Sequence, residues 1–154
     1  MIKVTDLAYA RFRAPDLDKM ETFLEHFGLV RSVRTDTVLY MRATDQHHHV
    51  HITELGETGF VGPAFYAANE ADLIAFSQTP GASSVENINE PGGGKRVRIT
   101  DPDGFEVEIV HGIKTVDRIP LNNNFKTNNG DDVRRKGELV RLKPGPAQCK
   151  RAGH

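Results

Sequence analysis

Hydrophobic and polar positions in this chain follow two periods, one typical of helices and one typical of strands. A spacing of three and four residues joins a set of apolar positions near the N-terminus: Leu17, Met20, Phe23, Leu24 and Phe27. Asp16 stands directly before this run as a helix N-cap, and Gly28 follows it as a glycine that ends a helix. The sequence therefore predicts a helix between Asp16 and Gly28.

The same pattern returns 53 residues later. Four pairs of residues match at this offset: Phe12 with Phe65, Asp16 with Asn69, Phe23 with Phe76, and Gly28 with Gly81. Asn69 is then the N-cap of a second helix, with Asp72 in its first turn, and Pro80-Gly81 ends that helix. The chain therefore contains an internal repeat.

Segments with the alternation of strands follow each predicted helix. VRSVRT, TVLYMRA and HHHVHITEL follow the first, and SSVENI, KRVRIT and FEVEIVH follow the second. This order predicts an α+β fold made of tandem β-α-β-β-β modules, with a curled mixed sheet around a cleft and the helices outside. We expect one paired domain over residues 1–112, with modules at about 1–56 and 57–112. Residues 113–154 are predicted to be an irregular linker.

The segment from Lys95 to Gly112 reads as a hairpin around Asp101-Pro102-Asp103-Gly104. A three-residue loop sets four cross-strand pairs: Ile99 with Phe105, Val97 with Val107, Arg98 with Glu106, and Arg96 with Glu108. One face of this hairpin is apolar and the other is charged. Cross-strand pairing with Arg96 is therefore the simplest role for Glu108.

Charge excludes one class of function. The chain holds 20 Lys/Arg and 21 Asp/Glu, for a formal net charge of −1. Residues 1–112 contain 10 Lys/Arg and 17 Asp/Glu, whereas residues 113–154 contain 10 and 4. The basic residues of the tail are spread out around a single aromatic residue, Phe125. Because a nucleic-acid site needs clustered cations, we expect no nucleic-acid partner.

Compartment and membrane association follow from similar observations. No segment approaches the ~20 consecutive apolar residues of a membrane span, so no membrane partner is expected. The opening segment MIKVTDLAYARF lacks the apolar core of a secretory signal. A lone Cys149 rules out an internal disulfide framework. We therefore expect a cytoplasmic protein.

The repeat also predicts which positions face the cleft. At the 53-residue offset Tyr9 corresponds to Gly62, and aligning HHVHI with FEVEI makes His51 correspond to Glu108. Tyr9, His51, Gly62 and Glu108 are therefore expected to converge. A separate row of imidazoles, His47, His49 and His51, has the strand period of two, and neutral imidazoles in such a row are able to bind Zn, Ni or Cu.

These motifs resemble the vicinal oxygen chelate superfamily, which includes glyoxalase I, bleomycin-resistance proteins and type I extradiol dioxygenases. DPDGFEVEIVHG is similar to the family's last strand, and GPAF at 62–65 is similar to its H-x-A-F strand, with Gly62 in place of the histidine. The resemblance implies that Glu108 occupies the family's carboxylate-ligand position and that Tyr9 replaces a second histidine. His51 and Glu108 are then weak metal-ligand candidates in an incomplete site.

Within this superfamily the chain most resembles the N-terminal, non-catalytic domain of two-domain extradiol dioxygenases. The linker ends in Gly153-His154, similar to the strand that opens the catalytic half, whose histidine is an iron ligand. The resemblance implies an Fe(II) enzyme that cleaves catechol-type aromatic rings with O₂. Its partners would be a C-terminal catalytic domain, further copies in a homo-oligomer and a small aromatic substrate. His154 would bind metal only in that complete enzyme, and no cofactor is expected for this chain alone.

Two alternatives remain open at this point. One is a stand-alone, metal-free protein of the bleomycin-resistance type that binds a small apolar or aromatic molecule in the cleft. The other is a glyoxalase-like metal-dependent isomerase or lyase whose metal site is completed across a dimer. Binding of an aromatic molecule to the isolated chain would favour the first. Further metal ligands in place of Tyr9 and Gly62 would be needed for the second.

Overall fold

The computed structural model describes residues 2–121 and 146–151 and has the predicted α+β architecture. The first module consists of β1 (Val4–Ala14), α1 (Leu17–His26), β2 (Val30–Arg34), β3 (Val38–Arg42) and β4 (His51–Leu55). The second consists of β5 (Gly59–Ala67), α2 (Glu70–Phe76), β6 (Glu86–Asn87), β7 (Lys95–Thr100) and β8 (Glu106–His111). The duplicated β-α-β-β-β order predicted from the repeat is confirmed.

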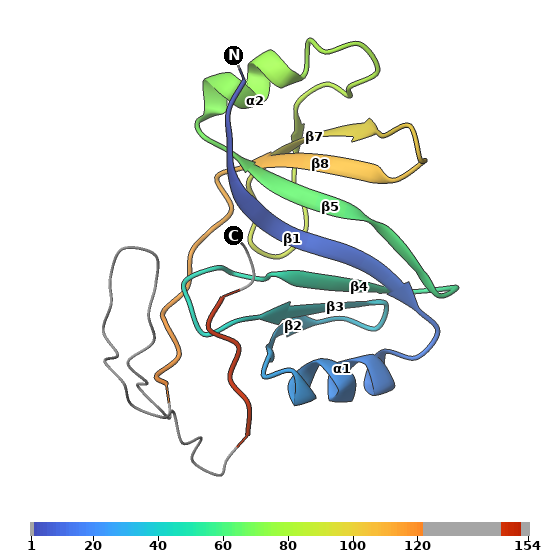
Figure 1. Cartoon of the computed structure of the whole chain (residues 1–154), viewed down its shortest axis with the longest axis vertical. Coiled ribbons are helices and arrows are strands. Elements are labelled where there is room, and N and C mark those ends of the chain that lie inside the picture. The colour runs from blue at the N-terminus through green and yellow to red at the C-terminus, as the bar shows by residue number, and fades with distance from the viewer. Residues whose placement is uncertain (1, 122–145, 152–154) are drawn as a thin grey trace, which may run out of the picture.

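The strands form one mixed, open sheet in the order β2-β3-β4-β1-β5-β8-β7-β6. Each module pairs its first and last strands in parallel, β1 with β4 and β5 with β8. The two modules join where β1 and β5 run antiparallel at the centre of the sheet. Figure 1 shows α1 and α2 at opposite ends of the molecule, with β1 and β5 crossing between them. Side chains from both modules therefore meet over these two central strands.

Both helices begin at the predicted caps. The Asp16 carboxylate accepts hydrogen bonds from the amides of Asp18 and Lys19, each at 3.0 Å. The Asn69 side chain accepts one from the Asp72 amide at 2.9 Å. Gly28 follows α1 with a φ of 83°, a conformation that glycine adopts without strain.

The buried face of α1 is narrower than its apolar spacing predicts. Leu17 and Leu24 pack against β3, but Glu21 takes the position between them and pairs with arginines of β2. Phe23 and Phe27 are instead 53% and 64% exposed and contact each other, with ring centroids 4.9 Å apart. The helical spacing is correct, but two of its aromatic residues lie at the surface.

The hairpin of β7 and β8 has a register two residues away from the predicted one. The pairs are Ile99 with Val107, Val97 with Ile109, Arg98 with Glu108, and Arg96 with Val110. The cause is the Asp101 carboxylate, which accepts hydrogen bonds from the amides of Asp103 at 3.0 Å and Phe105 at 2.8 Å and so draws Phe105 into the loop. Because side chains alternate with a period of two, this shift keeps each of them on its predicted face.

The described part of the tail packs against the first module. The amides of Val116 and Ile119 donate to the carbonyls of Gln46 and Thr44 at 3.0 and 2.9 Å. The Cys149 amide donates to the Gly28 carbonyl at 2.9 Å. The predicted linker is therefore attached to the fold at both of its described segments. His154 lies outside the described residues.

No helix in the described ranges has the length and apolar character needed to cross a membrane.

Gly62 is a point of close backbone packing between β5 and β8. A Cβ atom added at this position would lie 1.8 Å from the carbonyl oxygen of Glu106. That oxygen belongs to the backbone of β8, so relief would require the two strands to separate. Gly59, on the same strand, has no atom within 4 Å of an added Cβ.

We therefore expect Gly62→Ala to destabilise the fold by about 2 kcal/mol or more, since overpacking against backbone costs at least as much as in a core. Gly59→Ala is the matched control and should change the free energy of unfolding by less than about 0.5 kcal/mol. Urea unfolding of both variants measures the difference. Equal stability of the two variants would contradict this view of the β5–β8 contact.

Candidate functional site

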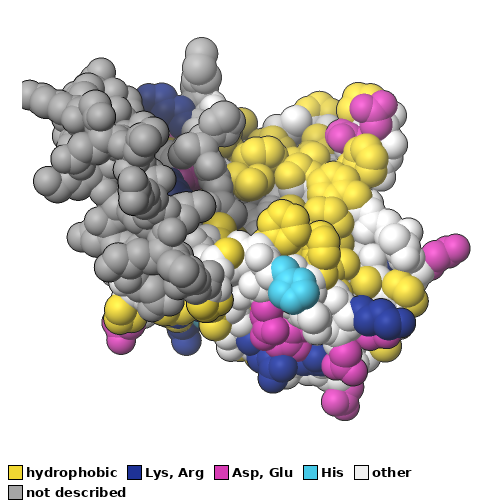
Figure 2. Space-filling view, turned by 60° about the horizontal axis from the view of Figure 1, so that its bottom comes forward, with side chains coloured by type: hydrophobic (Ala, Val, Ile, Leu, Met, Phe, Trp, Pro, Cys, Tyr) yellow, Lys and Arg dark blue, Asp and Glu magenta, His cyan; other side chains and the backbone are white. Residues whose placement is uncertain are grey.

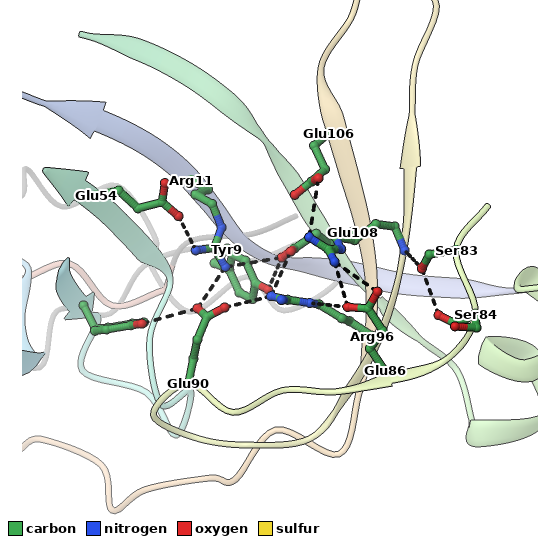
Figure 3. A network of polar contacts seen from close by, with 12 residues as sticks. Tyr9, Arg11, Glu54, Ser83, Ser84, Glu86, Glu90, Arg96, Glu106 and Glu108 are labelled. Atoms are coloured by element: carbon green, nitrogen blue, oxygen red, sulfur yellow. Dashed lines mark hydrogen bonds and ion pairs between the residues drawn. The ribbon is translucent and has the colours of Figure 1, made fainter. Parts of the chain in front are cut away.

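A cluster of charged and phenolic side chains lies where the two modules meet, and Figure 3 shows it. Its centre is Glu108 of β8, whose side chain is 4% exposed. The Tyr9 hydroxyl of β1 donates a hydrogen bond to Glu108 Oε2. The structure thus brings together two of the four predicted site positions.

Two guanidinium groups complete the surroundings of Glu108. Arg96 Nη1 of β7 donates to Oε1 at 3.1 Å, and Arg11 Nη2 of β1 lies 3.6 Å from Oε2. Both oxygens of the buried carboxylate therefore have donors or cations beside them. Arg96 contacts Glu108 as predicted, although from a diagonal position, since Val110 is its direct cross-strand neighbour.

A second carboxylate, from the loop between β6 and β7, closes the cluster. Glu90 accepts hydrogen bonds from Arg11 at 3.0 Å, from Arg96 at 2.8 Å and from the Tyr40 hydroxyl of β3 at 3.3 Å. Arg11 also donates to Glu54 of β4 at 2.8 Å. Glu90 belongs to the second module, whereas Arg11 and Tyr40 belong to the first, so the cluster ties the modules together.

The pKa values of these groups favour an ionised network with a neutral phenol. Burial, followed by the Glu108 charge, raises the pKa of Tyr9 far above its usual value, so its hydroxyl stays a donor. Burial alone would raise the pKa of Glu90, but Arg11 and Arg96 hold it below its usual range. Burial alone would lower the pKa of Arg11, but the charges of Glu108 and Glu90 raise it.

Beside the charged cluster, this face of the sheet is filled by packed side chains. A buried group is made of Ala8, Tyr9, Tyr40, Ile52, Ala64, Ile88 and Val110. Ile88 comes from the same loop as Glu90, and the amide of Ile88 donates to the Gly94 carbonyl at 2.9 Å. Side chains from both modules therefore pack against one another on this face, where the sequence predicted an open cleft.

His51 does not join Tyr9 and Glu108. At the repeat offset of 53 residues, Ala64 of β5 corresponds to Arg11 of β1. The strand partner of Ala64 is Glu108, and the strand partner of Arg11 is Ile52. Ile52 is therefore the structural counterpart of Glu108. A one-residue slip moves a side chain to the opposite face of a strand. His51 accordingly faces away, with its ring stacked on Phe12 at 4.8 Å and hydrogen-bonded to Thr53 at 2.8 Å.

The predicted row of three imidazoles is also absent from the described structure, because β4 begins only at His51. His47 contacts the Asp45 carboxylate at 2.7 Å and packs on Tyr66. His49 is buried, with its ring 5.0 Å from that of Tyr9 and 5.4 Å from that of Tyr40. The three side chains have separate surroundings.

These residues do not fit a metal ion. Within residues 2–121 and 146–151 no group of three or more His, Cys, Asp or Glu side chains is placed to hold one. Both oxygens of Glu108 face donors, and Gly62 has no space for any side chain. A site on this face would have to displace Tyr9 or Arg96 from the carboxylate.

Arg11, Tyr40 and Glu90 were not predicted from the sequence as members of the cluster. Arg11 has a signal, since it follows Tyr9 by two residues and therefore shares its face. Tyr40 could be placed in the same way, from the alternation of side chains along β3. Glu90 has none, because only the path of a glycine-rich loop brings it to the strands.

Removing the Tyr9 hydroxyl tests the hydrogen bond to Glu108. We expect Tyr9→Phe to destabilise the fold by about 1–3 kcal/mol, because a buried carboxylate loses a donor that water does not replace. Tyr66→Phe is the matched control, with no hydrogen bond found for its hydroxyl in the described structure, and should cost under about 0.5 kcal/mol. Chemical unfolding measures both, and equal losses would contradict the role of Tyr9.

Acid should destabilise the protein through its buried histidines. Burial lowers the pKa of His49 to about 3 and that of His51 to about 4, against about 6.5 in the unfolded chain. Only the unfolded state therefore gains these protons as the pH falls from about 6.5 towards 4, and stability is lost over that range. His49→Gln should reduce the slope of unfolding free energy against pH by about 1 kcal/mol per unit. Urea titrations across this range measure the slope, and an unchanged slope would contradict a buried neutral His49.

A scan of family models matches residues 6–109 to the glyoxalase/bleomycin resistance protein/dioxygenase superfamily. The search of curated proteins found no match. Among solved structures, the Mn(II)-bound glyoxalase from Novosphingobium aromaticivorans is similar with a TM-score of 0.72 and 22% identity, over 79% of this chain and 43% of that one.

Two dioxygenase structures are also similar. Homoprotocatechuate 2,3-dioxygenase from Brevibacterium fuscum, in an anaerobic complex with 3,4-dihydroxyphenylacetate, has a TM-score of 0.66 and 25% identity, over 76% of this chain and 39% of that one. The Arthrobacter globiformis enzyme of the same name has a TM-score of 0.64 and 22% identity, over 75% and 38%. The chain thus spans less than half the length of these neighbours. Because the family model covers most of its sequence, the chain belongs to the glyoxalase/bleomycin resistance protein/dioxygenase superfamily.

Proposed function

We propose that this chain is the N-terminal structural domain of an Fe(II)-dependent extradiol dioxygenase that cleaves catechol-type rings with O₂. The observation that carries the proposal is the state of Glu108. The residue that resembles the family's carboxylate ligand is saturated by Tyr9, Arg96 and Arg11. A domain whose centre is an ion network contributes stability and contacts, and the chemistry then belongs to a catalytic domain that follows His154.

The structural neighbours support this division of labour. The Brevibacterium fuscum enzyme was solved with a catechol-type molecule, and the chain matches only 39% of its length. A match of that extent leaves room in the relative for a further domain. By analogy, iron and substrate would be held in the part of the protein outside this chain.

Exposed aromatic side chains support a partner domain. Four phenylalanines, Phe23, Phe27, Phe60 and Phe105, are between 38% and 64% exposed. Figure 2 shows hydrophobic side chains gathered across one face of the molecule. Soluble monomers rarely expose large apolar patches, so such a face suits a packed catalytic domain or another copy in a homo-oligomer.

The two alternatives meet specific obstacles. A metal-free binding protein would need an open cleft, but Tyr9, Tyr40 and Ile52 fill that face. A glyoxalase-like isomerase or lyase would need metal ligands near Glu108, and Gly62 has no room for a side chain there. Both therefore rank behind the structural domain.

Anaerobic calorimetry with Fe(II) tests the proposal, followed by addition of catechol and air. The 154-residue chain should show no stoichiometric binding and form no ring-cleavage product. A protein extended beyond His154 should bind about one iron per chain and form the product. His154→Ala in the extended protein should abolish iron binding, whereas His51→Ala should leave it unchanged.

Stoichiometric Fe(II) binding by the 154-residue chain, with ring cleavage, would overturn the proposal. Loss of that binding in Glu108→Gln would then identify a self-contained metalloenzyme. Saturable binding of catechol without iron would instead favour the small-molecule binding protein. Circular dichroism of each variant separates a lost site from a lost fold.

A further inference from the structure

A cavity of about 450 Å³ lies between the first module and the tail, away from the cluster around Glu108. Its lining comes from the segment after β3 and from both described segments of the tail: Thr44, Asp45, Gln46, His47, Arg118, Ile119, Leu121, Lys150 and Arg151. The size falls within the range of small-molecule sites, which is roughly 300–1,000 Å³.

Backbone hydrogen bonds hold the walls of this cavity in place. The Ile119 amide donates to the Thr44 carbonyl at 2.9 Å, and the Thr44 amide donates to the Cys149 carbonyl at 2.9 Å. The Gln148 side chain donates to the Pro120 carbonyl at 3.2 Å, so the two tail segments also contact each other. The cavity is therefore built by the fold rather than left between separate surfaces.

The charges that line the cavity are unbalanced. Within the described parts of the chain, the side chains of Arg118 and Lys150 have no hydrogen bond or ion pair. The one carboxylate in the lining, Asp45, already accepts hydrogen bonds from the His47 ring at 2.7 Å and from the His47 amide at 3.1 Å. Arg151 pairs with Asp6 of β1. Two cations of the described residues therefore line the cavity without an ion pair, and Asp45 is the only carboxylate among the described lining residues.

Apolar groups supply a second kind of contact. Ile119 and Leu121 also line the cavity and are half-buried. A ligand that suits both features has an anionic group for Arg118 and Lys150 and a small apolar body for these two side chains. An inorganic anion would leave the apolar wall unused, and a neutral aromatic molecule would leave the cations unpaired.

We propose that this cavity is a binding site for small organic carboxylates with an apolar or aromatic body. Arg118 and Lys150 hold the carboxylate, while Ile119 and Leu121 contact the body. The inference is independent of the proposed dioxygenase role, because none of these residues belongs to the cluster around Glu108.

Titration with benzoate, followed by calorimetry and amide NMR shifts, tests the site. Benzoate should bind the 154-residue chain saturably, with the largest shifts at the amides of Gln46, His47, Ile119 and Lys150. Benzamide, which has the same shape and no charge, should bind at least about tenfold more weakly, a difference equivalent to the loss of one strong charge-assisted contact. Phenyl phosphate distinguishes a general preference for anions from one for carboxylates.

Two exposed cations provide variants that should not affect folding. Arg118→Ala and Lys150→Ala should each weaken benzoate binding about threefold to tenfold, and the double variant should abolish it. Lys114→Ala is the matched control, since it removes a cation of the same tail segment that does not line the cavity. Affinity should also fall as salt is added. Equal binding of benzamide, shifts elsewhere in the chain, or unchanged affinity in the double variant would overturn the proposal.

Discussion

The fold depends on how a buried carboxylate, Glu108, is neutralised at the junction of the two modules. A charge that is 96% removed from solvent must find donors within the protein, and here they come from both halves of the chain. Tyr9 and Arg11 of β1 reach it from the first module, and Arg96 of β7 reaches it from the second. Glu90 then balances the two arginines. Loss of a charged partner leaves an uncompensated charge, which costs about 3–5 kcal/mol in buried ion pairs.

The same constraint connects the fold with the proposed function. A metal on this face would compete with Tyr9 and two guanidinium groups for the oxygens of Glu108. Gly62, where the resembling family has a histidine, is pressed against the Glu106 carbonyl. The duplicated scaffold has therefore placed an ion network around the residue whose motif resembles the family's carboxylate ligand. This is the physical reason for proposing a structural role for this chain.

Features with a local cause could be predicted from the sequence. Asp16 and Asn69 cap their helices because a side-chain oxygen needs only an amide two or three residues away. The alternation of FEVEIVH placed Glu108 on the correct face even though the hairpin register moved by two residues.

Features with a distant cause could not be predicted. The counterpart of Glu108 is Ile52 rather than His51, because the counterpart is set by pairing with the distant strands β1 and β5 and not by the similarity of the local motifs. Glu90 reaches Arg11 only through the path of a loop.

A double-mutant cycle between Arg11 and Glu108 measures whether the junction of the two modules depends on this buried ion pair. Either single change, Arg11→Met or Glu108→Met, leaves a buried charge without its partner. The double variant removes both charges and fills the space with apolar atoms. We predict that the double variant is more stable than the sum of the single losses implies, with a coupling free energy of at least about 1.5 kcal/mol. Additive losses, measured by chemical unfolding, would mean that the junction of the modules does not depend on this ion pair.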